Sequence, residues 1–360
     1  MITYIFFPLV PIIIAFFFRR IGGLGIFITW AVATALLIIL MPLGSRDFNN
    51  YLRDFDEINS ASLFDVIRLD PLYSSVVWVS GHLGMSSHVF YLSFASLALA
   101  VKLAAIAKLA DKEALSIALY MCSFFFLHEF TQIRASLAIG LWMLGLSVLP
   151  QSRSRYFMWT LLGSFVHIQA VLGLLLYPIA VLLNSRWRAR IFALAVVIVI
   201  VISTFGIFDL LASNVINSFP DPRAAIYVAL AMESPVRPNP LSVMSLLAIF
   251  TALVGLLPGN RGGVVMPFHL QIENFVFYSL ILGSLSIALF ASIPIAAFRI
   301  SEHLFSLLPV GLLLAAKHVG ASRCIRPALW VFIGLFLYIF LFHSPYLLDP
   351  FTGQHPRDNE

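Results

Sequence analysis

Apolar segments recur along the whole chain, and they restrict the possible folds more than any motif does. They cover residues 2–18, 23–43, 87–107, 114–130, 133–150, 156–169, 170–184, 191–211, 240–257, 273–292, 299–317 and 327–344. A helix of about 20 apolar residues crosses the hydrocarbon core of a bilayer. Inside lipid, a helix also satisfies its own backbone hydrogen bonds. We therefore expect an all-α, polytopic integral membrane protein with about 10–12 transmembrane helices.

Composition excludes the main soluble classes. Of 360 residues, 61% are hydrophobic and 11% are charged, whereas soluble chains carry about 25% charged residues. The net charge of +5 does not indicate a nucleic-acid partner, because 22 cations spread over so apolar a chain form no basic face. The two cysteines, Cys122 and Cys324, predict neither a disulfide framework nor a zinc site. We expect residues 1–360 to form a single membrane domain.

The charges divide between two sets of connecting segments. The short connections are basic, and the longer ones carry most of the acids. With the basic connections in the cytoplasm, 14 of the 22 cations, Lys102 among them, and only three acids fall inside. The other side then holds 22 − 14 = 8 cations and 17 − 3 = 14 acids. This orientation puts both termini, and the large loops 44–86 and 212–239, on the periplasmic or extracellular side.

The first large loop contains two segments of helical character. Residues 45–58 predict an amphipathic helix with Asp47, Tyr51 and either Asp54 or Phe55 on one face. This helix can present Arg46 and Asp47 to a headgroup or a sugar, or it can be a solvated helix with local ion pairs. Residues 71–86 are too short and too polar for a span, and they predict an interfacial or re-entrant helix.

Three further polar groups lie at the outer ends of apolar segments. Ionisable residues at membrane depth are costly, so they are candidates for function. The first group, within 127–136, contains His128, Glu129, Thr131, Gln132 and Arg134, and its structural interpretation is a polar turn. The second contains His167 and Gln169, and its structural interpretation is a hydrogen-bonded histidine. The third lies on one helical face and contains Arg299, Glu302 and His303, which can also be an intrahelical ion pair.

Four of the eight cations on the outer side of this topology are Arg46, Arg134, Arg223 and Arg299. The planar, permanently charged guanidinium suits phosphate. The arginines therefore predict an anionic ligand at the outer leaflet, such as a lipid-linked phosphate or pyrophosphate. Neighbouring histidines and carboxylates can then serve as acid or base.

The order of these motifs resembles the EpsG family of Wzy-like polymerases of bacterial exopolysaccharide, capsule and O-antigen. The resemblance covers roughly residues 40–180 and 290–320. Its elements are D-x-x-x-Y (Asp47, Tyr51), D-P-x-Y (Asp70, Pro71, Tyr73), an arginine opening an apolar segment (Arg134), an outer-facing histidine (His167) and an arginine near the start of a late span (Arg299). The chain departs from the family at Asp70, where the family more often has glutamate.

The resemblance implies glycan transfer in the bacterial cytoplasmic membrane. A glycan on undecaprenyl pyrophosphate would pass to a sugar hydroxyl of a second lipid-linked repeat unit, with no metal or other cofactor. Besides these substrates and membrane lipid, a chain-length regulator is an expected partner. The implied pyrophosphate ligands are Arg134, Arg299, Arg223 and Arg46. His167 is the first choice of base, followed by Glu129 and Asp47. Expected contacts to sugar or acceptor come from Tyr51, Tyr73, Gln132, His128, Glu302 and His303.

Other functions are compatible with the same residues. A flippase or exporter of lipid-linked glycans would also need arginines for pyrophosphate, although transporters usually place charge near the midplane of the bilayer. A polyprenyl-phosphate-dependent glycosyltransferase or ligase would instead use the D-x-D pair of Asp54 and Asp56, together with a divalent metal. A purely structural membrane scaffold would leave the one-sided arginines and histidines unexplained.

Overall fold

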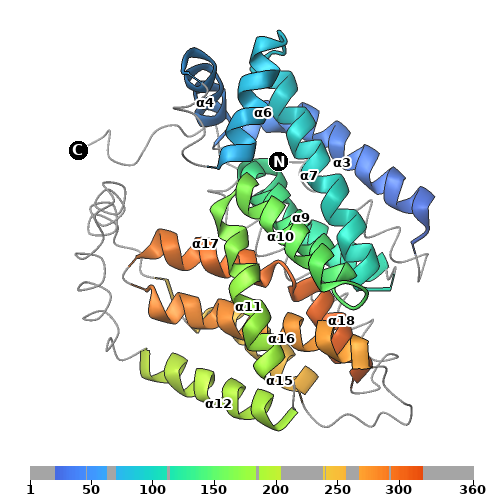
Figure 1. Cartoon of the computed structure of the whole chain (residues 1–360), viewed down its shortest axis with the longest axis vertical. Coiled ribbons are helices and arrows are strands. Elements are labelled where there is room, and N and C mark those ends of the chain that lie inside the picture. The colour runs from blue at the N-terminus through green and yellow to red at the C-terminus, as the bar shows by residue number, and fades with distance from the viewer. Residues whose placement is uncertain are drawn as a thin grey trace. The chain divides into compact units, whose positions relative to one another are not determined.

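The structure is a computed structural model, and it describes residues 21–45, 47–62, 70–111, 114–183, 186–203, 238–239, 241–256, 267–291 and 293–318. Within these ranges all regular structure is helical, which confirms the all-α prediction (Figure 1). The chain divides into two compact units, and each is described by itself below. The first comprises residues 1–171 and 323–360, and the second comprises residues 172–322. The expected single domain stays a prediction.

The first unit contains the described helices from α3 to α10, together with η1 and η2. Its long helices are α3 (Gly23–Gly44), α7 (Ser87–Leu109), α9 (Ile133–Val148) and α10 (Arg153–Val166). The shorter elements are α4 (Phe48–Ser60), α6 (Pro71–His82), α8 (Ala114–Ser123), the π-helix η1 (Phe126–Thr131) and the 3-10 turn η2 (Ile168–Ala170).

Three described helices are long and apolar enough to cross a membrane: Gly23–Pro42, Ser87–Leu109 and Ile272–Leu289. A fourth span is possible if the bent pair Ala296–Phe305 and Leu308–His318 counts as one. Five further apolar helices of 10–17 residues overlap other predicted spans. The polytopic class is therefore confirmed, whereas the number of spans stays a prediction. The predicted spans 2–18 and 327–344 lie outside the described residues.

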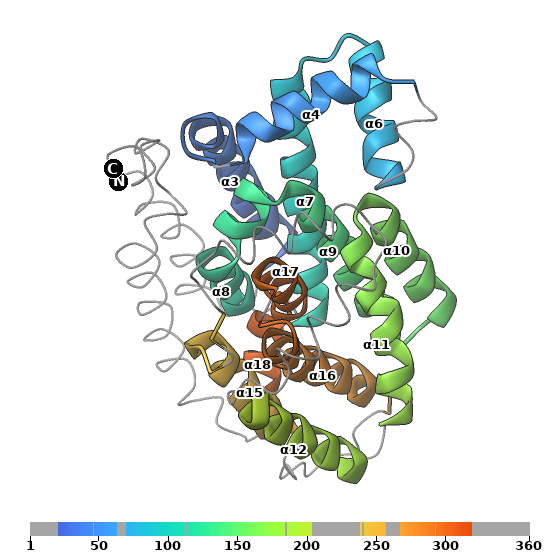
Figure 2. The same ribbon diagram turned by 90° about the vertical axis from the view of Figure 1, so that its left-hand side faces the viewer.

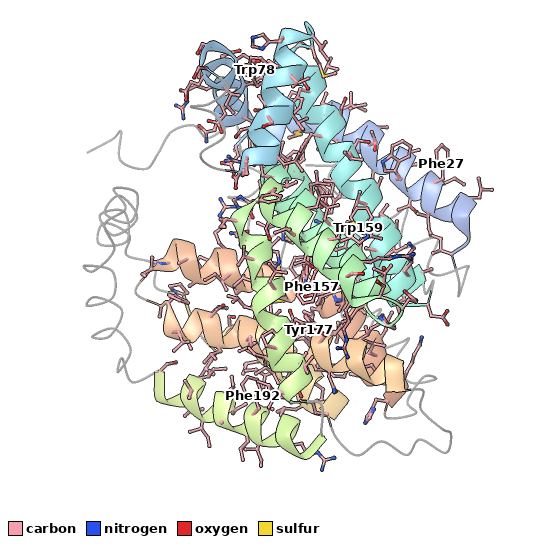
Figure 3. The ribbon with its side chains drawn as sticks, viewed as in Figure 1. Phe27, Trp78, Phe157, Trp159, Tyr177 and Phe192 are labelled. Carbon is pink, nitrogen blue, oxygen red and sulfur yellow. The ribbon has the colours of Figure 1, made fainter. Side chains whose placement is uncertain are left out.

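Apolar side chains on the helix surfaces fit a lipid environment. Phe27 on α3 is 56% exposed and Phe157 on α10 is 39% exposed (Figure 3). In the second unit, Phe250 is 65% exposed. Soluble proteins rarely leave contiguous surfaces of this kind in water. Such side chains are expected where a helix faces lipid.

Small residues let α9 approach its two neighbours closely. A Cβ at Gly140 would lie 3.4 Å from the backbone nitrogen of Lys102 on α7. A Cβ at Gly163 on α10 would lie 2.9 Å from the carbonyl oxygen of Ala138. Glycine at helix contacts is common in membranes, where backbone proximity replaces the hydrophobic effect as the source of association. Helices α7, α9 and α10 therefore form a tight core in this unit.

The two predicted loop helices are present and lie against the first turns of α7 (Figure 2). Helix α4 buries Phe48, Tyr51 and Phe55, as expected of an amphipathic helix. At Gly81 a side chain on α6 would collide with the amide of Asn59 on α4. This contact holds α4 and α6 together, near the end of the core at which α9 begins and α10 ends.

The predicted span 114–130 is not one α-helix. Helix α8 stops at Ser123, and η1 follows with the wider turn of a π-helix, ending where the N–H of Gln132 donates to the carbonyl oxygens of Leu127 and His128. The π-turn contains His128 and Glu129, whose side chains are fully buried. Prediction from hydropathy alone was wrong here, because it measures apolarity and not the local pitch of the helix. Single π-turns of this kind frequently mark functional sites.

The second unit contains α11, which begins at Val171 and ends at Leu182, and five further helices. They are α12 (Arg186–Ser203), α15 (Val243–Leu256), α16 (Pro267–Leu289), α17 (Pro294–Phe305) and α18 (Leu308–His318). Helix α16 contacts α12, α15, α17 and α18.

The predicted span 299–317 is also wrong as a single helix. Helices α17 and α18 meet at an angle of 46°. The break precedes Pro309, which has no N–H to donate to the carbonyl oxygen of Phe305. The residue before a proline is also disfavoured in the α conformation. The N–H groups of Val310 and Gly311 donate instead to the carbonyl oxygen of Leu307, which closes the turn.

Candidate functional site

Arg134 is the centre of a partly exposed cluster in the first unit. It lies in the first turn of α9, and its guanidinium lies between two carboxylates. Nη1 is 3.5 Å from Asp70 and Nη2 is 3.8 Å from Asp54. The same guanidinium lies 5.1 Å from the ring centre of Tyr73 and 5.8 Å from that of Tyr51, within range of cation–π attraction. About a third of the Arg134 side chain is exposed (34%), so a ligand can reach it.

Asp70 joins the arginine to a histidine. Its two carboxylate oxygens lie 3.0 and 3.1 Å from Nδ1 of His167, and one also accepts the N–H of Ile168 at 3.3 Å. With Nδ1 protonated, the imidazole donates to Asp70, and Nε2 becomes the acceptor. In the described part of the chain, no hydrogen bond engages Nε2. This is how an aspartate orients a catalytic histidine in many hydrolases and transferases.

The backbone at Asp70 is held in an uncommon conformation. Its φ of 45° and ψ of 58° place it in the left-handed region, which few residues other than glycine adopt, although aspartate tolerates it. Pro71 follows at the first position of α6, where its missing N–H costs nothing. The D-P pair thus ends the loop before α6 and points the carboxylate at the start of α9. Strain of this kind concentrates at functional sites.

The two carboxylates beside Arg134 have opposite pKa shifts. Burial alone would raise the pKa of Asp70, but the hydrogen bond from His167, the charges of His167 and Arg134 and the N–H of Ile168 lower it below the ordinary value of 3.8. At Asp54, burial outweighs the attraction of Arg134, and the pKa is raised. Asp70 is therefore the firmly held anion of the pair.

The two predicted sugar-stacking tyrosines line the buried side of Arg134. Tyr51 on α4 donates to the carbonyl oxygen of Thr131 at 2.9 Å, so α4 is fixed to the end of η1. Tyr73 on α6 donates to Tyr91 at 3.1 Å. Both rings are buried. They hold the guanidinium in place, and in this arrangement they present little ring surface to a sugar.

A second charged cluster is sealed in the core of the same unit. Nζ of Lys102 lies 2.8 Å from Oε1 of Glu129, and neither side chain is exposed. Glu129 also accepts hydrogen bonds from Tyr120 at 2.6–2.7 Å and from Ser136 at 2.7 Å. Lys102 donates to Ser136 at 2.8 Å and lies 3.4 Å from Nδ1 of His128. The cluster therefore joins α7, α8, η1 and α9.

Helix geometry separates the two clusters. Arg134 and Ser136 are two residues apart on α9, which places them about 200° apart around its axis. One therefore points to the open cluster and the other to the sealed one. Since Glu129 is fully buried and paired with Lys102, this placement favours a structural role over the catalytic one considered from sequence. The complete burial of His128 favours the same assignment over acceptor binding. Lys102, which the charge pattern of the sequence assigns to the cytoplasmic side, is buried within α7 and does not lie in a connecting segment.

The comparison with known families identifies the family of this chain. The EpsG family model matches residues 25–349. The chain belongs to the EpsG family. This is a family of polysaccharide polymerase-like membrane proteins, so the protein is a multi-pass membrane protein of polysaccharide biosynthesis. No curated protein matches the chain, and no solved structure matches it either.

The remaining predicted residues of this EpsG-family chain lie elsewhere. Asp47 precedes α4 and is half-buried, and Gln132 connects η1 to α9. Arg299, Glu302 and His303 lie on α17 of the second unit, where His303 is buried and the other two are partly exposed. Arg46 and Arg223 lie outside the described residues. The structure thus brings together Arg134, His167, Tyr51 and Tyr73 of the predicted site.

Sequence reasoning missed five residues of these clusters as site members. Asp70 appeared only within the family motif, and Asp54 appeared on one face of the predicted amphipathic helix and in a metal-binding pair. On α4, however, Asp54 and Asp56 point in opposite directions, and Asp56 is exposed while Asp54 faces Arg134. Lys102, Tyr120 and Ser136 were not predicted as site residues, although a lysine deep inside an apolar segment signals a buried partner. Within the described ranges, no group of three or more His, Cys, Asp or Glu side chains can hold a metal ion.

Proposed function

We propose that the protein polymerises oligosaccharide repeat units carried on undecaprenyl pyrophosphate, at the outer face of the bacterial cytoplasmic membrane. The product would be a surface polysaccharide such as O-antigen, capsule or exopolysaccharide. The observation that carries the proposal is the joined set of Arg134, Asp70 and His167, which offers a phosphate ligand and an oriented base on one partly exposed surface. Membership of the EpsG family supports the same reaction class.

In the proposed reaction, the acceptor hydroxyl oxygen of one lipid-linked unit bonds to the anomeric carbon of the other. The bond from that carbon to the pyrophosphate oxygen breaks. Undecaprenyl pyrophosphate leaves with the electron pair of that bond. The acceptor proton passes to Nε2 of His167, so atoms and charge balance.

Arg134 stabilises the charge that develops on the leaving group. A guanidinium can hold two phosphate oxygens at once, and fixed cations at a developing anion are a large source of rate acceleration. Arg134 lies in the first turn of α9, and the positive end of the helix dipole there favours an anion in the same place. Asp70 acts by positioning both Arg134 and His167.

The test is a polymerisation assay with purified protein in proteoliposomes and the lipid-linked repeat unit of the source bacterium. A ladder of chain lengths is expected from wild type. Arg134→Ala and His167→Ala should yield unpolymerised units. A flippase would move the unit across the bilayer without lengthening it, and a metal-dependent transferase would stop when a chelator is added. If both variants polymerise at the wild-type rate, the proposal is wrong.

A further inference from the structure

Two carboxylates flank Arg134, and they are held very differently. Asp70 is 11% exposed and accepts three contacts: from His167, from the N–H of Ile168 and from Arg134. Asp54 is 30% exposed, and its one ion pair among the described residues is the 3.8 Å contact with Nη2 of Arg134. A contact of this length between partly exposed groups is weak. One side of the guanidinium is therefore tightly held, and the other is occupied by a loosely held anion.

A bound phosphate needs an N–H edge of this arginine. The Asp70 side is fixed by the histidine that must also stay in place, so the edge that can be released is the one facing Asp54. Asp54 lies on α4, where its neighbours along the helix, Arg53 and Glu57, pair with each other at 3.6 Å and are exposed. Water can therefore solvate Asp54 once it leaves the arginine.

We propose that Asp54 is a placeholder for substrate phosphate on Arg134. In the empty site its carboxylate occupies the outer edge of the guanidinium, and a phosphate oxygen of the lipid-linked substrate replaces it there. This inference rests on the proposed function, because it takes the phosphate ligand of Arg134 from it. Asp54 then lies beside the bound phosphate as a like charge, which weakens binding and favours release of the pyrophosphate product.

Removing the charge of Asp54 and removing the charge of Asp70 should therefore change the Kd for a phosphate ligand in opposite directions. Purified protein in detergent is titrated with farnesyl pyrophosphate as the probe. Farnesol measures binding of the isoprenoid tail alone, and inorganic pyrophosphate measures binding of the head group alone. Asp54→Asn should lower Kd for farnesyl pyrophosphate by about fivefold, the size expected from removing one like charge near a partly hydrated anion. Asp70→Asn should raise Kd, because Arg134 and His167 lose their common partner.

Glu57→Gln is the matched control, since it removes the same charge from the same helix without touching Arg134. Its Kd should equal that of wild type. Equal tightening by Glu57→Gln and Asp54→Asn would mean that only net charge matters, and the placeholder assignment would be overturned. Unchanged or weaker binding by Asp54→Asn would overturn it as well. Asp54→Ser serves as a second variant, with thermal unfolding of each protein measured alongside.

Arg134→Ala distinguishes this inference from the proposed function. If Arg134→Ala abolishes binding and Asp54→Asn does not tighten it, the placeholder fails and the phosphate site stands. If Arg134→Ala binds farnesyl pyrophosphate as wild type does, the phosphate site assigned in the proposed function fails, and the placeholder fails with it. Tight binding of farnesol by every variant would show that the tail alone is recognised, which would also overturn the inference.

Discussion

The sealed and open clusters of the first unit lie on opposite faces of α9, and both contain a cation between acceptors. Lys102 and Glu129 are fully buried, and every hydrogen bond among Lys102, Glu129, Tyr120 and Ser136 is 2.6–2.8 Å long. Arg134 is partly exposed, and its carboxylate contacts are 3.5 and 3.8 Å long. The four sealed residues hydrogen-bond to one another at short distances, whereas Nη2 of Arg134 has a weak carboxylate contact that it can exchange. Short contacts between fully buried groups indicate a structural role, and a weak contact beside solvent indicates a binding role.

The largest expected effect tests the sealed cluster. Lys102→Met should leave Glu129 as an unpaired buried charge and destabilise the protein by about 3–5 kcal/mol. The double variant Lys102→Met with Glu129→Leu should recover most of that loss, because both charges are then gone. Thermal unfolding in detergent measures both. If the single variant is as stable as the double, the pair is not a coupled buried unit.

The next effect tests the open cluster. Arg134→Ala should lower kcat/KM of polymerisation by about 100-fold or more, as expected when one charge stabiliser of a transition state is removed. Its unfolding temperature should move far less than that of Lys102→Met. Arg134→Lys keeps the charge but not the two-edged fork, so it should recover only part of the activity. A loss of stability as large as that of Lys102→Met would show that Arg134 is structural, and the two clusters would not differ in role.

A smaller effect concerns pH. Since the pKa of Asp70 is lowered in the folded state, this carboxylate contributes stability above its ordinary pKa of 3.8. That contribution is lost as the pH falls through the lower folded-state value. Asp70→Asn should cost about 1–3 kcal/mol near neutral pH, and the difference from wild type should shrink below the ordinary pKa. Unfolding curves over a pH series give the measurement, and a difference that is constant with pH would contradict the assignment.

The smallest effect lies on the exposed face of α4. The Arg53–Glu57 pair has both side chains more than two-thirds exposed (69% and 68%). Double replacement by Gln should change stability by no more than about 0.5 kcal/mol, and polymer length on a gel should not change. A larger loss would show that α4 uses its outer face as well as the face that packs on α7.

The sequence predicted the helical class and the amphipathic helix that is α4. It also predicted a division between residues 169 and 170, close to the 3-10 turn η2 that separates α10 from α11. These depend on local periodicity, which is readable from one chain. It did not predict η1 or the break before Pro309, because both interrupt a continuous apolar run. Arg134 and His167 were found from their places at segment ends. Their link through Asp70 was not, because a contact between segments far apart in sequence has no local pattern. The burial of Lys102 was not predicted either, since a count of charges by side takes no account of depth.

The two clusters are completed at different times during synthesis, because the residues within each are separated by different lengths of chain. Lys102 and Glu129 are 27 residues apart, and Asp70 and His167 are 97 apart. At about 5–20 residues per second, the sealed pair is complete seconds after Lys102 is made. His167 is synthesised roughly 5–20 seconds after Asp70. The nascent chain therefore has its buried ion pair before it has its candidate active site. A chain halted before α10 would contain both residues of the buried ion pair and no histidine to orient.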